Sequence, residues 1–479
     1  MVTALIIAVL AAGILVSCTY IIYERNSPSA TMAWLLAMIF LPFIGIMSYF
    51  VFGRRRLKVR VQLLKAIREE VGDIWEKLDF DGQFRAVLKS GACDPRFHDL
   101  MLLAYRSPGL PPTLGNSVHV LNDAENAYPA ILEAIAAARH HIHVLYFIIQ
   151  PDRSGRMLRD ALTERARAGV EVRVLYDDIG SWKMKPGFFA PLVEAGGKVR
   201  EYRPVRLSRF RTFYANFRNH RKIVVVDGKT AFTGGINIGD EYLGQDPGVG
   251  FWRDTNIKVT GPAAGHLQLV FAEDWYYATD ELLTDAYVRQ DGAPALDLGV
   301  VQVVPSGPDR LWEQIEMLFF TAITSARKSL YITTPYFVPD ESVQSALVAA
   351  SLRGVDVRLL VPRRPDKKIV YYAGRSYFRE LLAAGCRIYE YTAGFIHAKT
   401  MSVDGEVGIV GTANMDIRSF RLNFEVCAVC YDRAVAEGLD RQFMADIKGA
   451  ERVELKGFSR RPRLDVFLEN TARITSALL

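Results

Sequence analysis

Two long apolar runs open the chain, and a mixed pattern of short strand-like and helix-like segments follows them. The first run, Val2–Tyr23, has no charged residue and is long enough to cross the hydrocarbon core of a bilayer. The second run spans about Met32–Phe52, and Pro42 within it is a tolerated kink if the helix lies in a membrane. Because a short polar link separates the runs, the pattern predicts a transmembrane helical hairpin over residues 1–56.

Positive charge is concentrated directly after the second run, where residues 54–56 are all arginine. Positive residues beside membrane helices stay on the cytoplasmic side, so this cluster places the rest of the chain, and the N-terminus, in the cytoplasm. A cleaved signal peptide is the weaker alternative, because no Lys or Arg precedes the first run. The same absence argues against a lipoprotein signal, although Leu15–Cys18 resembles its cleavage site.

The remainder of the chain is long enough for two domains. Residues 57–112 mix charged and apolar positions and predict a connector, which ends in the breaker sequence SPGLPP at 107–112. Beyond it, short β-branched runs alternate with helix-like segments, as in an α/β layer architecture.

This α/β pattern occurs twice. The strand-like sequence GVEVRVL that starts at Gly169 matches GVDVRLL at Gly354, and further matches follow in the same order. We therefore predict two tandem homologous domains, 113–295 and 296–479, each with a mixed β-sheet flanked by helices.

Composition does little to narrow the function. A formal net charge of +6 suits an anionic surface or a phosphate-bearing partner, without separating lipid from nucleic acid. The five cysteines form no disulfide framework, and Cys427 and Cys430 lack the further ligands of a zinc site. We therefore expect no metal and no other cofactor.

Each copy contains the spacing His-x-Lys-x4-Asp, which is the strongest chemical signal in the sequence. The residues are His220, Lys222 and Asp227 in the first copy and His397, Lys399 and Asp404 in the second. Residues two apart on a strand share a face, so the His and Lys of each apolar run are expected to point the same way. Asp-Gly at the end of each run predicts a hairpin turn. All six residues enter the candidate catalytic set, with a structural turn role favoured for the two aspartates.

Small and amide residues end the second strand of each hairpin. They are Gly235 and Asn237 in the first copy and Thr412 and Asn414 in the second. Small residues let the backbone approach a ligand, and amides donate hydrogen bonds to phosphate oxygens, so these four are the candidate substrate-binding residues. Turn capping is the alternative role for the asparagines.

Paired motifs of this kind fit the chemistry of a phosphodiester. Lysines neutralise the phosphate oxygens, one neutral imidazole attacks phosphorus, and a second imidazole protonates the leaving alkoxide and later deprotonates the incoming alcohol. Each copy supplies one histidine, so the reaction needs both copies, and it needs no metal. A carboxylate would orient each imidazole, and Glu425 and Asp254 are the candidates.

These residues resemble the signature of the phospholipase D superfamily and, within it, of the bacterial cardiolipin synthases. The N-terminal hairpin, Phe395–Lys399 and Trp252–Asp254 also resemble cardiolipin synthase segments. The resemblance implies one active site between two phospholipase-D-type domains and a phosphatidyl-histidine intermediate. It implies transfer of a phosphatidyl group between two phosphatidylglycerols, with release of glycerol. By family habit His220 is the nucleophile and His397 the general acid and base, although the near-symmetry of the copies does not decide this.

The resemblance also implies where the protein works and with what. The expected partners are phosphatidylglycerol and other anionic phospholipids, in a bacterial inner membrane that the chain crosses more than once, with cytoplasmic catalytic domains. The cationic and aromatic run 203–218 suits a lipid interface or single-stranded nucleic acid, and the hairpin favours lipid, so no nucleic-acid partner is expected. Oligomeric state stays open.

Two other functions stay open. A membrane-bound phospholipase D or another phosphodiesterase, nucleases included, would use the same residues with water as the acceptor. The family resemblance and the expected exclusion of water favour transfer. A non-catalytic membrane scaffold with a decayed site is disfavoured, because both motifs are intact.

Overall fold

The computed structural model describes residues 2–23, 28–49, 79–107, 109–202, 216–245, 250–284, 299–364 and 366–476. The chain divides into two compact units, a small N-terminal helical unit and a body built on one large sheet.

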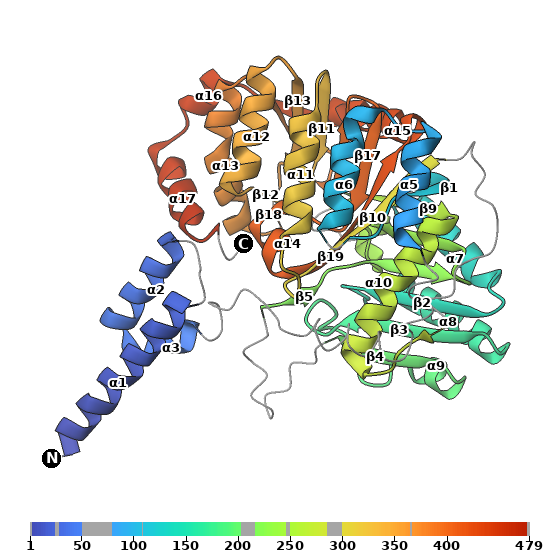
Figure 1. Cartoon of the computed structure of the whole chain (residues 1–479), viewed down its shortest axis with the longest axis horizontal. Helices are drawn as coiled ribbons and strands as arrows, with labels where there is room; N and C mark the ends of the chain where they lie inside the picture. The colour runs from blue at the N-terminus through green and yellow to red at the C-terminus, as the bar shows by residue number, and fades with distance from the viewer. Residues whose placement is uncertain are drawn as a thin grey trace. The chain divides into compact units, whose positions relative to one another are not determined.

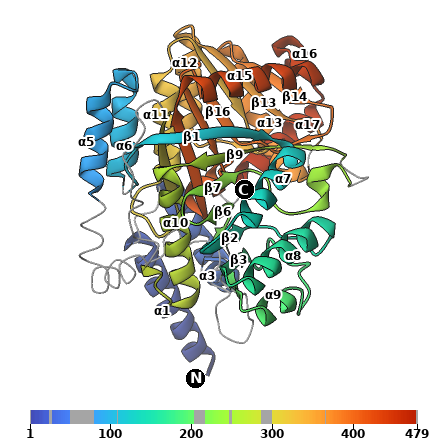
Figure 2. The same cartoon turned by 90° about the vertical axis from the view of Figure 1, so that its right-hand side faces the viewer.

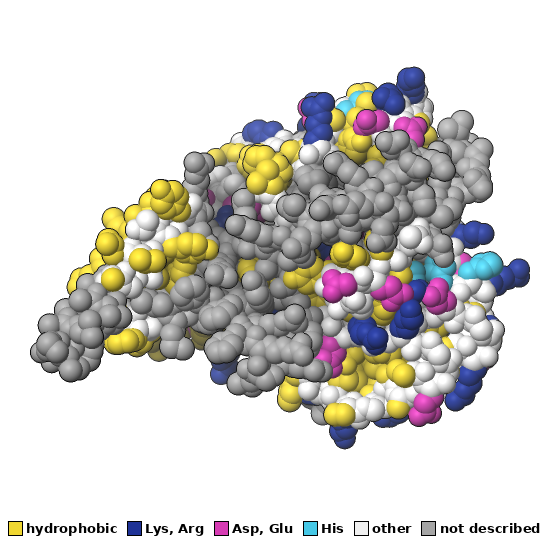
Figure 3. Space-filling model, turned by 60° about the horizontal axis from the view of Figure 1, so that its bottom comes forward, with side chains coloured by type: hydrophobic (Ala, Val, Ile, Leu, Met, Phe, Trp, Pro, Cys, Tyr) yellow, Lys and Arg dark blue, Asp and Glu magenta, His cyan; other side chains and the backbone are white. Residues whose placement is uncertain are grey.

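The N-terminal unit contains three helices, α1 (Val2–Tyr23), α2 (Pro28–Phe40) and α3 (Pro42–Ser48). The second apolar run is therefore divided at Leu41, because proline has no N–H to donate and favours the first turn of a new helix. Hydrophobic side chains are prominent on the surface of this unit (Figure 3), and Leu15 and Phe40 are 69% and 75% exposed. Across the described residues, no helix combines the length and apolar character required to cross a membrane, so the transmembrane hairpin stays a prediction.

The body is built on a sixteen-stranded sheet (Figure 1). Fifteen of its strands form two halves that repeat one strand order, and the short strand β5 (Arg218–Asn219) pairs outside that order. From the centre outward, the first half has β1 (Thr113–Asn122), β9 (Thr255–Thr260), β7 (Thr230–Gly234), β6 (Ile223–Val226), β2 (His141–Tyr146), β3 (Glu171–Asp177) and β4 (Lys198–Tyr202). The second half has β10 (Gly299–Ser306), β19 (Asn423–Tyr431), β17 (Val407–Gly411), β16 (Thr400–Val403), β11 (Ser329–Thr333), β13 (Asp356–Pro362), β14 (Arg387–Tyr391) and the edge strand β20 (Ala450–Val453). Antiparallel pairing of β1 with β10 joins the halves.

Helices cover both faces of the sheet (Figure 2). The first half has α7 (Asp123–Ala136), α8 (Arg153–Arg167), α9 (Ala190–Glu194) and α10 (Pro262–Thr279). The second half has α11 (Gln314–Ser325), α12 (Glu341–Leu352), α13 (Lys368–Ala383), α14 (Ile417–Arg421), α15 (Arg433–Asp446), α16 (Leu455–Ser459) and α17 (Arg463–Ile474). Because α10 packs against β10 and α15 packs against β1, each of these two helices reaches across to the other half. The architecture is α/β with a mixed sheet, as the alternating pattern predicted.

The described part of the predicted connector folds as α5 (Phe80–Ser90) and α6 (His98–Arg106). Phe84, Leu100 and Met101 from these helices are buried in the apolar core of the second half. The pairing of α6 with α11 extends that core. Because these two helices are amphipathic, their charged residues led to the prediction of a connector instead of helices that complete a core.

Both Asp-Gly pairs form tight turns in which the aspartate and the glycine have positive φ. The φ values are 52° and 64° at Asp227 and Gly228, and 57° and 67° at Asp404 and Gly405, as a two-residue hairpin turn requires. The carboxylate of each aspartate accepts N–H groups at the start of a neighbouring strand. Asp227 binds the N–H groups of Arg139, His140 and His141, and Asp404 binds those of Arg327, Lys328 and Ser329.

These contacts fasten each turn to the sheet. Burial raises the pKa of Asp227, but the three N–H donors lower it more, so this pKa lies below its usual range. Arg96, between α5 and α6, also donates to Asp404 and so ties the second turn to the helical pair.

Replacing Asp227 with alanine should destabilise the protein by roughly 1.5 kcal/mol, the low end for bonds to a charged group, because the turn is half-exposed. The melting temperature of the purified protein measures this. Asp227→Asn keeps an acceptor oxygen and tolerates positive φ, so it should lose less stability. Activity per folded molecule should change little in both variants; a normally melting Asp227→Ala protein without activity would contradict the structural role.

Candidate active site

The two histidine–lysine pairs lie between strands, which corrects the prediction that each motif lies on one continuous strand. In the first half, β5 (Arg218–Asn219) ends just before His220, and β6 begins just after Lys222. In the second half, β15 (Phe395–Ile396) and β16 enclose the second pair in the same way. The strand is interrupted because the chain changes its pairing partner at each histidine.

Each short strand before a motif pairs with the opposite half of the body. β5 pairs in parallel with β19, and the N–H of His220 donates to the carbonyl oxygen of Phe424 at 2.9 Å. Likewise β15 pairs in parallel with β8 (Trp252–Arg253), and the N–H of His397 donates to the carbonyl oxygen of Arg253 at 2.7 Å. One residue further along each ladder, a carboxylate stands beside the histidine.

Each imidazole is held by a carboxylate from the other half. Nδ1 of His220 lies 2.9 Å from Oε1 of Glu425, and Nδ1 of His397 lies 2.8 Å from Oδ2 of Asp254. Both acids are completely buried. Because a carboxylate accepts the proton on Nδ1, Nε2 carries the lone pair of each neutral ring. The structure thus places both carboxylates that the sequence suggested beside a histidine, and each holds the histidine of the other half.

The two lysines are buried next to their histidines in different ways. Nζ of Lys222 donates to the carbonyl oxygen of His220 at 2.7 Å. Nζ of Lys399 donates to the carbonyl oxygen of His397 and lies 2.9 Å from Nδ1 and 3.2 Å from Nε2 of that ring. Burial lowers the pKa of Lys222 to about 7 and that of Lys399 to about 8. The positive charge of Lys399 lowers the pKa of Lys222 further.

Both histidines are neutral at neutral pH. Burial lowers the pKa of His220 and of His397 to about 4, against the raising effect of Glu425 and Asp254. The charges of both Lys222 and Lys399 lower the pKa of each ring, so the two motifs share one electrostatic environment. Burial raises the pKa of Glu425, but the nearby cationic groups and hydrogen bonds lower it more.

The two small residues of the candidate binding set border the carboxylates. A Cβ on Gly235 would lie 2.1 Å from Oδ1 of Asp254, so only glycine leaves room for that acid. In the second half, the hydroxyl of Thr412 donates to Oε2 of Glu425 at 2.5 Å. Their position favours support of the two acids over contact with phosphate.

The two asparagines differ although their sequence positions match. Nδ2 of Asn237 donates to the hydroxyl of Tyr242 at 2.8 Å, and Oδ1 accepts the N–H of Ile148 at 3.2 Å. Oδ1 of Asn414 is buried, with no hydrogen-bond partner within the described ranges. The hydroxyl of Tyr242 also lies 3.3 Å from Nδ1 of His397, a contact that sequence reasoning missed.

Sequence reasoning also missed two buried arginines that hold the backbone of the carboxylates. Arg221 donates to the carbonyl oxygen of Glu425 at 3.0 Å and to Asp274 at 2.7 Å. Arg253 donates to the carbonyl oxygen of Asp254. In the sequence, each arginine is simply the neighbour of a candidate site residue. That position does not predict its hydrogen bonds without knowledge of the fold.

Comparison with known proteins gives relatives of nearly the same length. Residues 131–275 and 319–447 match the family described as "Cardiolipin synthase, PLD-like domain", and residues 6–54 match "Phospholipase_D-nuclease N-terminal". A cardiolipin synthase of Geobacillus sp. (strain WCH70) is 44% identical over 98% of this chain and 93% of its own. The major cardiolipin synthase of Bacillus subtilis (strain 168) is 39% identical over 98% of this chain and 97% of its own.

A solved structure supports the fold. The phosphatidylserine synthase of Haemophilus influenzae Rd KW20 superposes with a TM-score of 0.58 at 17% identity, covering 76% of this chain and 95% of that chain. At this identity the likeness concerns the fold alone.

Glu425→Gln should lower kcat for phosphodiester turnover by about 10²-fold or more, because the amide cannot stabilise a charged His220 and favours the wrong tautomer. Asp254→Asn should act in the same way through His397. Glu437→Gln, an exposed glutamate on α15, is the control and should keep the wild-type rate. Unchanged kcat in a folded Glu425→Gln protein would contradict the orienting role.

The pH dependence of kcat/KM should have two limbs. It should fall as the pH drops through about 4, because His220 is then protonated and Nε2 loses its lone pair. It should also fall as the pH rises above about 4, because His397 then loses the proton that it would give to a leaving group. The fall should become steeper above about 7 to about 8, because Lys222 and Lys399 then lose the charge that neutralises phosphate. A rate that kept increasing well above the pKa of Lys399 would contradict the role given to the lysines.

Proposed function

The chain belongs to the cardiolipin synthase family of phospholipase-D-like proteins, and we propose that it transfers a phosphatidyl group from one phosphatidylglycerol to another, forming cardiolipin and releasing glycerol. The observation that carries the proposal is the crossed pair of imidazole–carboxylate contacts, His220 with Glu425 and His397 with Asp254. Either half alone would lack the carboxylate that holds its own histidine. The proposed reaction therefore belongs to a single site made by both halves.

In the first step, Nε2 of His220 attacks the phosphorus of the donor lipid. The bond from phosphorus to the glycerol oxygen breaks, and His397 gives its proton to the departing alkoxide. His397 takes up this proton from solvent when the donor binds, because the anionic phosphate raises the pKa of His397 in the complex. The ammonium of Lys399 faces Nε2 of His397 at 3.2 Å, which supports His220 as the nucleophile.

In the second step, the phosphatidyl group moves to the second lipid. A hydroxyl of the incoming phosphatidylglycerol forms the new bond to phosphorus, its proton passes to His397, and the phosphorus–nitrogen bond to His220 breaks. Lys222 and Lys399 neutralise the phosphate oxygens, and the amide group of Asn414 donates a hydrogen bond to them. The burial of both histidine side chains, 11% and 8% exposed, supports transfer over hydrolysis because it limits access by water.

We also propose that the N-terminal unit anchors the enzyme in a bacterial inner membrane, with its catalytic body in the cytoplasm. The match of residues 6–54 to the N-terminal family and the exposed apolar side chains of α1 and α2 support an anchor. The three arginines at 54–56 support the orientation. This arrangement brings the site to phosphatidylglycerol and other anionic phospholipids.

Incubating the purified full chain with radiolabelled phosphatidylglycerol tests the proposed reaction. Cardiolipin and free glycerol should appear together, while phosphatidic acid as the main product would identify a hydrolase instead. His220→Ala and His397→Ala should each lower the rate by about 10⁴-fold or more, since neither step proceeds with one imidazole. His119→Ala, an exposed histidine on β1, is the matched control. Near-normal turnover in either active-site variant would contradict the two-histidine scheme.

A further inference from the structure

A lipid acceptor presents a problem that a water acceptor does not. The incoming phosphatidylglycerol carries its own phosphate, three carbons from the hydroxyl that reacts, and so brings a second negative charge to the site. A group outside the catalytic pair must bind that phosphate and keep water from taking the acceptor's place.

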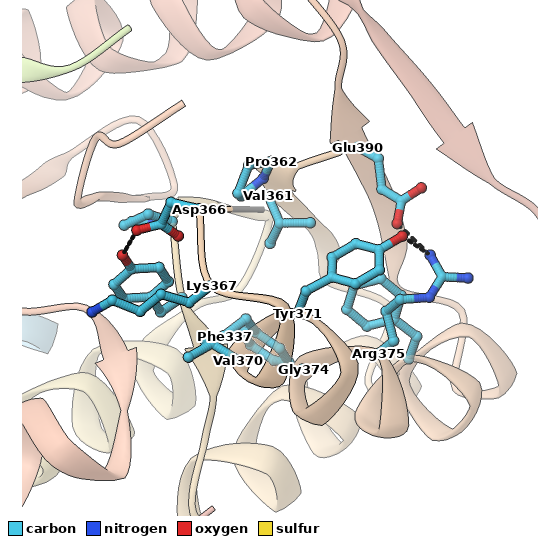
Figure 4. Close-up of a pocket in the computed structure, with 13 residues that line it drawn as sticks. Phe337, Val361, Pro362, Asp366, Lys367, Val370, Tyr371, Gly374, Arg375 and Glu390 are labelled. Carbon is cyan, nitrogen blue, oxygen red and sulfur yellow. Dashed lines mark hydrogen bonds and ion pairs between the residues drawn. The ribbon is translucent and has the colours of Figure 1, made fainter. Parts of the chain in front are cut away.

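The second half of the body contains a pocket where β13 ends and α13 begins (Figure 4). Figure 4 shows polar side chains at its two ends, with Asp366 and Lys367 at one and Arg375 and Glu390 at the other. Between the ends the lining is apolar, from Phe337, Val361, Pro362 and Val370. A pocket with polar ends and an apolar floor suits a phospholipid headgroup and the apolar carbons next to it.

The pocket lies next to the catalytic centre. Its wall residue Phe337 belongs to β12 (Phe337–Val338), which pairs in parallel with β18 (Met415–Asp416), and Asn414 directly precedes β18. Thr334, two residues before the pocket residue Tyr336, lines a smaller cavity together with Lys399. The charge of Asp366 also acts on Lys399 and raises its pKa.

The two polar ends differ in what they offer a ligand. Arg375 is held by Glu390 at 2.5 Å and by Glu469 at 3.2 Å, so its charge is already matched. Lys367 is exposed and makes no ion pair with another described residue, and its Nζ lies 5.2 Å from the centre of the Tyr336 ring. The hydroxyl of Tyr336 donates to Asp366. The Lys367 end therefore has a cation for a phosphate and, beside it, acceptors for hydroxyl groups.

Among the described residues, the first half differs from the second at the positions that match this pocket. α13 has 16 residues, whereas the corresponding α9 has 5. Ile148 occupies the position that Tyr336 occupies in the second copy, counted from the shared Pro-Asp that follows each. The pocket therefore belongs to the half that supplies His397, the base proposed for the incoming alcohol.

We infer that this pocket binds the acceptor phosphatidylglycerol, with its phosphate at Lys367, its secondary hydroxyl at Asp366 and its apolar part on the floor formed by Phe337 and Val370, which leaves the terminal hydroxyl to reach His397. The inference rests on the proposed transferase function and adds the location of the second lipid.

The test compares two acceptors that use the same donor step. Purified protein receives phosphatidylglycerol in mixed micelles with radiolabelled glycerol, and both cardiolipin and labelled phosphatidylglycerol are measured. Free glycerol has no phosphate, so its exchange into the lipid needs both histidines but does not need Lys367. The ratio of cardiolipin formation to glycerol exchange therefore reports the acceptor site alone.

In Lys367→Met, this ratio should fall by about 10-fold or more, the loss expected for one charge-assisted contact, while glycerol exchange continues close to the wild-type rate. Lys368→Met removes the neighbouring exposed lysine and should leave the ratio unchanged. Val370→Phe fills the apolar floor and should lower the ratio as Lys367→Met does, with exchange showing that the protein is folded.

Each other outcome decides a separate question. An unchanged ratio in both Lys367→Met and Val370→Phe overturns the acceptor site and leaves the transferase intact. Equal loss of both activities in Lys367→Met, or an equal effect of Lys368→Met, also overturns it. A wild-type protein that exchanges glycerol but makes no cardiolipin overturns the proposed function itself.

Discussion

The exchange of strand partners at the two histidines is the constraint on which the rest of this structure depends. The N–H groups of His220 and His397 each extend a short parallel ladder into the opposite half, and the next residue of that ladder is the carboxylate that holds the ring. Imidazole and carboxylate are therefore positioned by the sheet itself and not by mobile loops, which keeps their geometry within the tolerance that catalysis requires. Antiparallel pairing of β1 with β10 and the packing of α10 and α15 across the centre hold the halves in register for this exchange.

Burial gives the site its chemical character. Two lysines and two acids lie out of water beside the histidines, which is unfavourable unless the charges match and the remaining hydrogen bonds are made. Here the acids accept from the imidazoles, and Arg221 and Arg253 fix the peptide carbonyls of those acids. The same burial keeps both imidazoles neutral at neutral pH, so that one ring is ready to attack phosphorus and the other to accept a proton from an alcohol. Stability and reactivity therefore depend on one set of contacts.

The two halves have a common scaffold but differ in the side chains around the candidate site. Thr412 supports Glu425 with a hydroxyl where Gly235 leaves space for Asp254, and Asn237 is bound by Tyr242 where Asn414 leaves its oxygen unpaired among the described residues. The long helix α13 lines a pocket in the second half, whereas the corresponding helix α9 has only 5 residues. A transferase that joins two copies of one lipid needs this kind of difference, because donor and acceptor perform opposite roles in the same reaction.

The sequence alone was sufficient for whatever depends on neighbours along the chain. The duplicated motif, the α/β pattern and the Asp-Gly turns follow from local spacing, because side-chain direction and positive φ are decided within a few residues. Only the tertiary structure decided that His220 meets an acid 205 residues away and His397 one 143 residues away, although both acids could be suggested as candidates. It also decided that the motifs lie between strands, that α5 and α6 complete a core and that α13 encloses a pocket. These features arise where elements distant in sequence pack together. A local sequence pattern does not predict which distant surface an element will pack against.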